Sequence, residues 1–427
     1  MSNPKTALEI NWKKNLFFVW LSQFLSLAGF GCCMPFIPLL LKDNLGVTDP
    51  KMQVIYVSLY GFAGMLSLCI ASAFWGILAD RFGRKIMLLR ASYGAAVFYP
   101  LLAFAPNVAV LILIRFICSF FSGTVNPAQT LLVTTSPSNK HGFVLGTIST
   151  SVWSGNMVGY MAGGFIVEYF SYTTAFLLCG AVYLFSGVMI HLFVKENFQK
   201  PEKKPETKKV SKWVSFREQA TPGIVWLLAM FLIMGVARRI EQPFVAIQVE
   251  TVNGAGKAAL YTGWISAAAA LGGVFSGVII GHLCDRFAPR KLIGPVLALS
   301  VAGTLVQAWA PNITTLLLAR FFTFLAAGGL QPILQVLLSK IILPEKRGTF
   351  FGWSQSVNTA GGIICNLMTI GLACAVGSDP DIVRWIFTMA AFLLFIMIPL
   401  AIPTIKACKK EFICDPDATA KELRKAN

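Results

Sequence analysis

The chain has 427 residues, of which 56% are hydrophobic and 13% charged, and its formal net charge is +17. This is more apolar surface than a soluble core of that length can bury, so the composition excludes a soluble globular protein and predicts an integral membrane protein. The basic excess needs no nucleic acid as a partner, because basic loops are attracted to the anionic lipid surface on the cytoplasmic side.

Twelve apolar runs are long enough to cross about 30 Å of hydrocarbon. The first follows a short basic N-terminus, Met1 to Lys14, and no small-residue cleavage site follows it, so we interpret it as a retained span and not a signal peptide. Glycines and prolines interrupt several runs, which membrane helices tolerate when neighbouring helices satisfy the backbone. The expected spans are 15–41, 54–78, 87–104, 108–132, 143–169, 172–195, 223–249, 258–283, 292–309, 313–339, 349–377 and 383–405.

Signals of catalytic or metal chemistry are missing from the sequence. There is no nucleotide-binding loop, which excludes an ATP-driven pump, and the ten cysteines and three histidines show no metal-ligand spacing. We therefore expect a non-enzyme without metal or cofactor, driven by an ion or substrate gradient.

The second half of the chain repeats the first at an offset of 205 residues. Gly76 and Asp80 recur as Gly281 and Asp285, and Arg115 recurs as Arg320. The same offset relates Pro38 to Pro243, and several further glycine, proline and asparagine positions. The repeat predicts an all-α membrane protein of two pseudo-symmetric six-helix bundles.

Composition divides the chain into four parts. Residues 1–195 and 223–405 form the two predicted bundles, and the basic, polar stretch 196–222 is the predicted linker between them. That stretch is too polar to build a core, although 213–220 has the composition of a short surface helix. Residues 406–427 are predicted to form a polar cytoplasmic tail.

Lysine and arginine set the predicted orientation. With the N-terminus inside, most basic residues fall on the cytoplasmic side and both chain ends are cytoplasmic. The exceptions are a few outer-loop residues and four arginines inside spans. The outer-loop residues are Lys42, Lys51, Lys257 and Arg384.

The loop after span two concentrates charge and glycine, and a degenerate copy follows span eight. It reads G-I-L-A-D-R-F-G-R-K from residue 76 to residue 85. The residues of interest are Gly76, Asp80, Arg81, Gly83, Arg84 and Lys85, with Gly281, Asp285 and Arg286 in the copy.

Twelve spans, a basic central loop and this loop motif resemble the major facilitator superfamily over essentially the whole chain. The resemblance implies that Asp80 faces the N-terminal end of a helix in the opposite bundle and acts as a conformational latch. It implies that Gly76 lets helices approach and that Gly83 permits a tight turn. Asp285 would share the latch role, although Ala288-Pro289 replaces the second glycine of the motif. The alternative for the basic residues is a plain cytoplasmic anchor.

Span four carries a buried arginine. Arg115 lies eight residues in from Asn107, ~12 Å down a helix, so its charge needs a partner or a watery cavity. It resembles the superfamily's intramembrane arginine, which implies a role in coupling or substrate binding, and Arg320 repeats it. The alternative is structural hydrogen bonding to carbonyl groups.

Spans five and eight carry glycine stripes, which we expect to pack against each other across the bundle interface. The segment 155–164 also resembles the motif of exporters and antiporters, with Tyr160 where that motif has proline. With Ser149-Thr150 before this segment, the span-five region most resembles the bacterial drug:proton antiporters of twelve spans. The alternative is helix packing alone. The stripes are Gly155, Gly159, Gly163 and Gly164 in span five, and Gly273, Gly277 and Gly281 in span eight.

Span one lacks the carboxylate that many such exporters carry, and span seven supplies one instead. Arg238, Glu241 and Gln242 are spaced three and four apart, as on one helix face. Ionisable groups inside a span are candidate functional residues, and a carboxylate between burial and an arginine suits a proton carrier. The alternative is a structural Arg238–Glu241 pair that reaches the outer surface.

We therefore expect a monomeric, multi-pass transporter of the bacterial inner membrane that works by alternating access. The favoured function is proton-coupled efflux of small amphipathic organic compounds. One alternative is a transporter of an anionic metabolite or siderophore, suggested by the intramembrane arginines. The other is a non-transporting sensor on the same fold.

Overall fold

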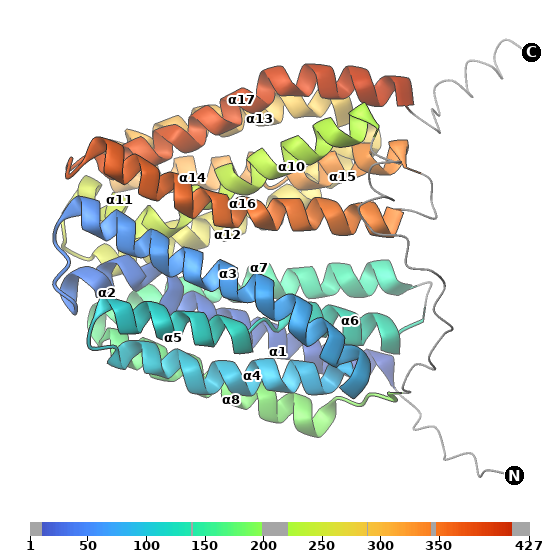
Figure 1. Ribbon diagram of the computed structural model, residues 1–427, viewed down its shortest axis with the longest axis horizontal. Helices are drawn as coiled ribbons and strands as arrows, with labels where there is room; N and C mark the ends of the chain where they lie inside the picture. Colours follow the sequence, from blue (N-terminus) through green and yellow to red (C-terminus); the bar gives the residue numbers. More distant parts are fainter. Residues whose placement is uncertain (1–10, 138–139, 199–220, 288, 343–346, 412–427) are drawn as a thin grey trace, which may run out of the picture.

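The computed structural model describes residues 11–137, 140–198, 221–287, 289–342 and 347–411. Long helices run along one axis in two bundles that lie side by side (Figure 1). The first contains α1 (Trp12–Cys33), η1 (Met34–Phe36), α2 (Ile37–Asp43), α3 (Pro50–Phe82), α4 (Arg84–Leu101), η2 (Leu102–Phe104), α5 (Val108–Phe121), α6 (Val125–Thr135), α7 (His141–Tyr169) and α8 (Tyr172–Phe193). The second contains α10 (Pro222–Ile240), η4 (Gln242–Phe244), α11 (Val245–Asn253), α12 (Ala258–Arg286), α13 (Pro289–Ala308), α14 (Ile313–Ala327), α15 (Leu330–Ile341), α16 (Arg347–Val376) and α17 (Ile382–Glu411).

The predicted all-α membrane fold is confirmed. Eleven stretches of the described chain are long and apolar enough to cross a membrane. The remaining predicted span corresponds to α7, a helix of 29 residues that is rich in Gly, Ser and Thr. Because α7 packs between α1 and α12, protein covers much of its surface, and a less apolar sequence is sufficient there.

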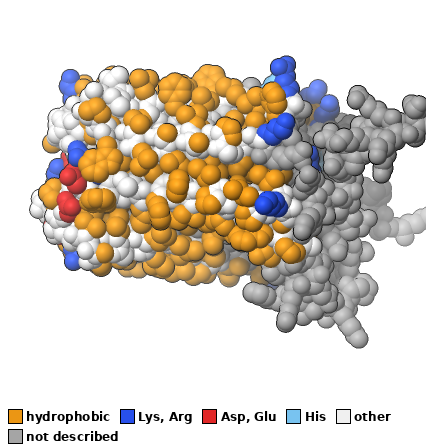
Figure 2. Space-filling view, turned by 90° about the horizontal axis from the view of Figure 1, so that it is seen from above, with side chains coloured by type: hydrophobic (Ala, Val, Ile, Leu, Met, Phe, Trp, Pro, Cys, Tyr) orange, Lys and Arg blue, Asp and Glu red, His pale blue; other side chains and the backbone are white. Residues whose placement is uncertain are grey.

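The two ends of the molecule differ in which chain segments they hold. We call the end where α1 begins, α8 ends and α10 begins the linker end, and the end that holds α2 and α11 the far end (Figure 1). Apolar side chains cover the middle of the surface, and charged ones gather toward the two ends (Figure 2). The helix α17 continues past residue 406 to Glu411, so the tail predicted from 406 begins as helix. The helix predicted at 213–220 lies outside the described residues.

Spans one and seven break at equivalent places. Each α-helix gives way to a short 3₁₀ segment, Met34–Phe36 in span one and Gln242–Phe244 in span seven, before it resumes. Proline at the centre of each segment cannot donate the backbone hydrogen bond that a continuous helix needs. These segments lie 208 residues apart, so Pro243 corresponds to Pro35 and the predicted match to Pro38 is wrong. The two breaks pack against each other at the bundle interface.

The bundles share one apolar core only toward the far end. There a single cluster contains Leu41 and Val54 from the first bundle and Phe244 and Val249 from the second. Toward the linker end, each bundle has a separate cluster of its own among the described residues. The interface is therefore closed at the far end.

Polar contacts reinforce the far-end closure. Lys42 Nζ lies 2.9 Å from both carboxylate oxygens of Glu250, and deeper in the interface the hydroxyls of Ser58 and Thr369 are 2.7 Å apart. Asp49 caps α3, and a hydrogen bond from Ser378 of the second bundle lowers its pKa.

The glycine stripes do not pack as predicted. A Cβ at Gly155, Gly159 or Gly163 meets the backbone of α1 within the same bundle. Only Gly164, one residue further and therefore turned ~100° around the helix, faces Ala259 and Gly263 of α12. Of the span-eight glycines, Gly273 meets the ring of Trp153, whereas no atom lies within 4 Å of a Cβ at Gly277. The prediction that the two stripes pack on each other is therefore wrong for most of their residues.

Candidate transport cavity

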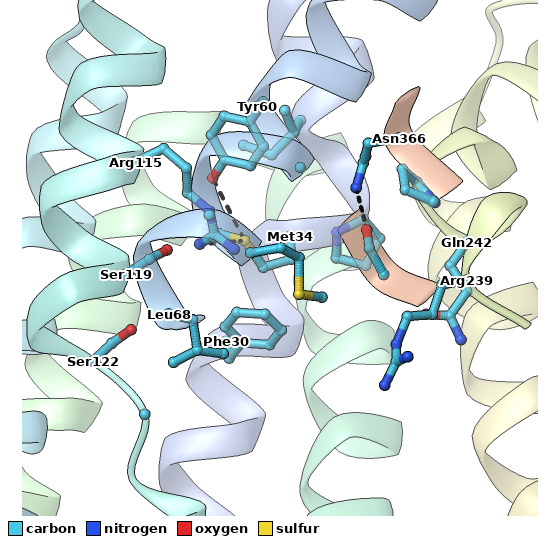
Figure 3. A pocket seen from close by; sticks show the side chains of 18 of the residues that line it. Phe30, Met34, Tyr60, Leu68, Arg115, Ser119, Ser122, Arg239, Gln242 and Asn366 are labelled. Carbon is cyan, nitrogen blue, oxygen red and sulfur yellow. Dashed lines mark hydrogen bonds between the residues drawn. The ribbon is translucent and has the colours of Figure 1, made fainter. Parts of the chain in front are cut away.

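A cavity of about 390 Å³ lies between the bundles, on the linker side of the far-end closure. Its wall comes from both halves of the chain (Figure 3). Phe30, Met34, Tyr60 and Leu68 give it a largely apolar and aromatic surface, to which Asn366 of α16 adds an amide. Such a size and lining suit a small organic molecule with an apolar body.

Arg115 of α5 brings one positive charge to this cavity. Its guanidinium carbon lies 4.9 Å from the centre of the Tyr60 ring, and Nη1 lies 3.5 Å from Met34 Sδ. The Nε atom is buried without a hydrogen-bond partner. Gly64 makes room for the side chain, because a Cβ there would lie 2.7 Å from Nε. Arg115 is thus held by an aromatic face and a thioether, without a carboxylate partner.

Arg239 of α10 brings a second charge from the other bundle. Its Nη1 donates to the carbonyl oxygen of Asn358 in α16, and the side chain lines the cavity opposite Arg115 (Figure 3). No Asp or Glu appears in the described cavity wall. Two guanidinium groups in an apolar cavity produce a positive potential that attracts anions and repels cations. Arg239 is one of the four arginines that the sequence places inside spans, but it was not among the predicted site residues.

Glu241 lies elsewhere, in the interior of the second bundle. It is 3% exposed, and its Oε1 accepts a hydrogen bond from Arg320 Nη1 at 2.5 Å. The same nitrogen donates to Gln307 Oε1 at 2.9 Å. The alternative of a structural Arg238–Glu241 pair at the outer surface is therefore wrong. Since α10 ends at Ile240, the rule that residues three apart share a helix face does not extend to Glu241.

A small polar chamber of about 90 Å³ joins this ion pair to the bundle interface. Arg320 and Gln242 line it from the second bundle, and Asn156 and Tyr160 line it from α7 of the first. Gln242 and Tyr160 also line the large cavity. Glu241 Oε2, Arg320 Nε and Asn156 Oδ1 are buried without a protein partner. The chamber is large enough for water molecules, which such unpaired polar atoms would bind.

The structure resolves part of the charged loop after span two. Gly83 joins α3 to α4 with φ 98°, a conformation that glycine adopts readily. Glu196, just after α8, accepts hydrogen bonds from the backbone nitrogens of Arg84 and Lys85 at 3.0 and 2.8 Å. The carboxylate therefore caps the positive end of α4.

Other residues of this loop have separate roles. Lys85 Nζ donates to the carbonyl oxygen of His191, and the Arg81 guanidinium lies 5.4 Å from the ring of Phe82. No atom lies within 4 Å of a Cβ at Gly76, so the close helix approach predicted there is absent in this conformation.

The predicted latch lies outside what the structure describes. The side chains of Asp80 and Asp285, and the surroundings of Gly281, are outside the described part of the chain. Arg286 is exposed at the end of α12, and Arg238 is partly buried in α10. The latch at Asp80 and Asp285 stays a prediction.

Comparison with known families decides what kind of protein carries this cavity. The model of the Major Facilitator Superfamily matches residues 19–255 and 243–413. The chain belongs to the major facilitator superfamily. Among relatives, the multidrug resistance protein MdtG of Salmonella arizonae is 32% identical over 372 residues, 87% of this chain and 91% of that protein. The protein of the same name from Rahnella sp. is 30% identical over 378 residues, 88% and 91% of the two chains.

Solved structures of other transporters share the fold of this chain. A bacterial homologue of the human lysosomal transporter Spinster, in an inward-facing and unoccupied conformation, superposes with a TM-score of 0.76 at 15% identity, over 97% of this chain and 100% of that one. The nucleoside transporter NupG gives a TM-score of 0.72 at 13% identity, over 92% and 98%. As a superfamily member, this chain is a multi-pass secondary transporter for a small molecule.

Proposed function

We propose that this transporter exports amphipathic organic anions across the bacterial inner membrane in exchange for protons. The observation that supports the substrate class is the cavity wall, in which Arg115 and Arg239 lie on opposite sides, one from each bundle, with no carboxylate among the described lining residues. The rest of the cavity wall is apolar and suits the hydrophobic part of such an anion. The MdtG relatives are named multidrug resistance proteins, and export of toxic compounds would explain such resistance.

The direction of transport rests on the orientation that lysine and arginine predict. With the linker end in the cytoplasm, a protein closed at the far end is in the state that loads substrate from inside. The rocking of the two bundles would then open the far end and release the anion outside. The far-end contacts between Lys42 and Glu250 would break at that step.

Glu241 is the proposed proton carrier. When it is ionised, its charge and that of Arg320 compensate each other inside the second bundle; when it is protonated, the ion pair is lost and Arg320 needs a new partner. Two protonation states can thus bias two packings of the same helices. Water in the polar chamber would connect Glu241 with the main cavity.

Membrane potential adds to this driving force. A proton that enters and a monovalent anion that leaves move charge in the same electrical sense, so a one-for-one exchange moves two elementary charges. An inside-negative potential contributes about 2.3 kcal/mol per charge per 100 mV. Export of an anion by this route is therefore electrogenic.

Ligands with matched tails and opposite head charges test the substrate class. Binding of decanesulfonate and decyltrimethylammonium is measured by calorimetry in phosphatidylcholine nanodiscs. We expect the sulfonate alone to bind, with about a tenfold weaker Kd in Arg115→Gln and in Arg239→Gln, since one charge-assisted hydrogen bond contributes ~1.5 kcal/mol or more. Arg384→Gln, which removes a charge at the far end outside the cavity, is the control.

Preference for the cation, or sulfonate binding that neither cavity variant weakens, would overturn the anion proposal and favour export of cationic or neutral compounds. Flux of the same ligands in proteoliposomes separates a transporter from a sensor. Tight binding without any flux would contradict export.

A further inference from the structure

A second cavity, of about 330 Å³, lies inside the first bundle between α3, α4 and α6. We call it the α3–α6 vestibule. Arg84 lines it at the start of α4, near the linker end, and Arg90 lies one to two turns deeper. At its other end it shares Leu68, Ser122, Gly123 and Val125 with the transport cavity. The vestibule is therefore a side space that adjoins the transport cavity and extends from it toward the linker end.

The local sequence explains why this space exists. Span four breaks at Gly123, whose backbone has a φ of 95°. The helix α5 ends before this residue, and α6 begins after it as a separate helix. The facing side of α3 carries small residues, Ala71, Ser72, Gly76 and Ala79. A Cβ at Gly76 would meet nothing within 4 Å. The vestibule is open space that small side chains and a broken helix leave between the helices.

Arg90 is the distinctive group in the vestibule wall. Its guanidinium carbon lies 4.0 Å from the centre of the Trp75 ring. Nε donates to the Met87 carbonyl and Nη1 to the Phe120 carbonyl, both at the long distance of 3.4 Å. Carbonyl bonds of this length are weak, and no carboxylate is present in the described vestibule wall. An anionic oxygen would give this guanidinium shorter, charge-assisted hydrogen bonds.

We propose that the α3–α6 vestibule is a loading site for an amphipathic anion, with Arg90 binding the acidic head and the wall of Leu68, Ala71, Trp75 and Met87 binding the apolar tail. The ligand then moves past Gly123 to Arg115 in the transport cavity. The movement of the ligand from the vestibule to the transport cavity rests on the proposed function. Binding of the anion in the vestibule does not depend on the proposed function. The chemistry fits a free amphiphile from the cytoplasm and an anionic lipid of the inner leaflet.

Thiol labelling tests the site without any transport. Ser72 is exposed and lines the vestibule. Within the described chain, its hydroxyl donates a hydrogen bond only to the carbonyl oxygen of Cys69 in the same helix. The substitution Ser72→Cys is therefore a mild change. Sulfonatoethyl and trimethylammonioethyl methanethiosulfonate carry opposite charges on reagents of similar size. Mass spectrometry of the peptide that holds position 72 separates its labelling from that of native cysteines.

We expect the sulfonate reagent to modify Ser72→Cys about tenfold faster than the cationic one, the size of effect that a focused positive field produces. Arg90→Gln should remove most of that preference. Lys14→Gln, which removes an exposed charge at the same end of the same bundle, should keep it. Decanesulfonate should protect the thiol, and decyltrimethylammonium should not.

Two further arms identify the source of the ligand and separate this proposal from the proposed function. Protection by phosphatidylglycerol nanodiscs relative to phosphatidylcholine supports the site with lipid as its ligand, and protection by decanesulfonate alone supports it with a free amphiphile. Equal rates for the two reagents, or a preference that Arg90→Gln leaves intact, overturns the loading site. If protection is found but decanesulfonate is never transported, the proposed function fails and the vestibule site stands.

Discussion

The ion pair between Lys42 and Glu250 gives the sharpest prediction about the conformational cycle. It bridges the two bundles at equivalent positions, 208 residues apart, and both Nζ–Oε distances are 2.9 Å. The side chains are 33% and 14% exposed. Exposed pairs contribute 0–1 kcal/mol, and removing one partner of a fully buried pair costs about 3–5 kcal/mol. The half-buried pair of Lys42 and Glu250 lies between the exposed and the fully buried case, so we expect its loss to cost ~1–2 kcal/mol.

That energy predicts a measurable shift in population. If Glu250→Gln weakens only the far-end-closed state, the equilibrium moves toward far-end opening about 5–30-fold. Electron–electron double resonance between spin labels at Lys51→Cys and Lys257→Cys, placed on opposite bundles at the far end, reads this out as growth of a longer distance. The exposed thiols of the described chain, Cys69 and Cys374, are first replaced by serine, together with Cys284, Cys408 and Cys414, whose side chains lie outside the described part.

Two controls isolate the bridge. Arg384→Gln breaks a far-end ion pair within one bundle, 3.2 Å long, and should leave the distances unchanged. The charge exchange Lys42→Glu with Glu250→Lys should restore the closed population. An unchanged distance distribution in Glu250→Gln, or an equal shift in Arg384→Gln, refutes the idea that this pair holds the far end closed.

Three further predictions follow from packing and from buried charge. Gly159→Ala should lower the melting temperature of the purified protein, because the new Cβ meets the backbone of α1 at Ala28 and overpacking costs ~1–3 kcal/mol; Gly277→Ala, with open space around it, should melt like the parent. Glu196→Ala should speed hydrogen exchange of the Arg84 and Lys85 amides, since loss of a helix cap costs ~0.5–2 kcal/mol, and unchanged exchange would deny the cap. Arg320→Gln should destabilise the protein more than the double variant Glu241→Gln/Arg320→Gln, because the single change leaves a buried carboxylate uncompensated; equal melting temperatures would argue against an ionised Glu241.

Much of the fold could be predicted from the sequence, because membrane spans and repeats leave strong signals. A run of apolar residues long enough to cross the hydrocarbon has few other uses, and two halves with the same motifs fold alike. The span at α7 shows the limit of that reasoning. Its apolar run at 143–169 was long enough to predict a span, but it is not among the eleven most apolar stretches of the described chain, since it packs between protein helices.

The site could be predicted only in part. Beyond a helix break, the spacing along the sequence no longer tells which residues lie on the same face of the helix. The spacing of Arg238 and Glu241 indicated a pair, but the break that follows Ile240 directs Glu241 to Arg320, 79 residues away in sequence. Arg239, in the last turn of α10 before the break, lines the cavity instead. The proline at position 243 was a signal for such a break, and breaks of this kind often mark binding sites in transporters.

The prediction that the two glycine stripes pack on each other failed for a related reason. Glycines four apart predict a close helix contact, and that contact exists, but nothing in their spacing names the partner helix. Gly159 and Gly164 belong to one motif and yet face α1 and α12, on different sides of α7. Assigning the partner needed the three-dimensional arrangement.

Uphill movement of decanesulfonate in proteoliposomes under an imposed pH gradient tests the proposed export most directly. We predict that the anion accumulates against its gradient when protons move the opposite way, that decyltrimethylammonium does not, and that Glu241→Gln abolishes accumulation while exchange of the anion down its own gradient continues. Accumulation of the cation alone, or full uphill transport of the anion in Glu241→Gln, would contradict proton-driven anion export through this cavity.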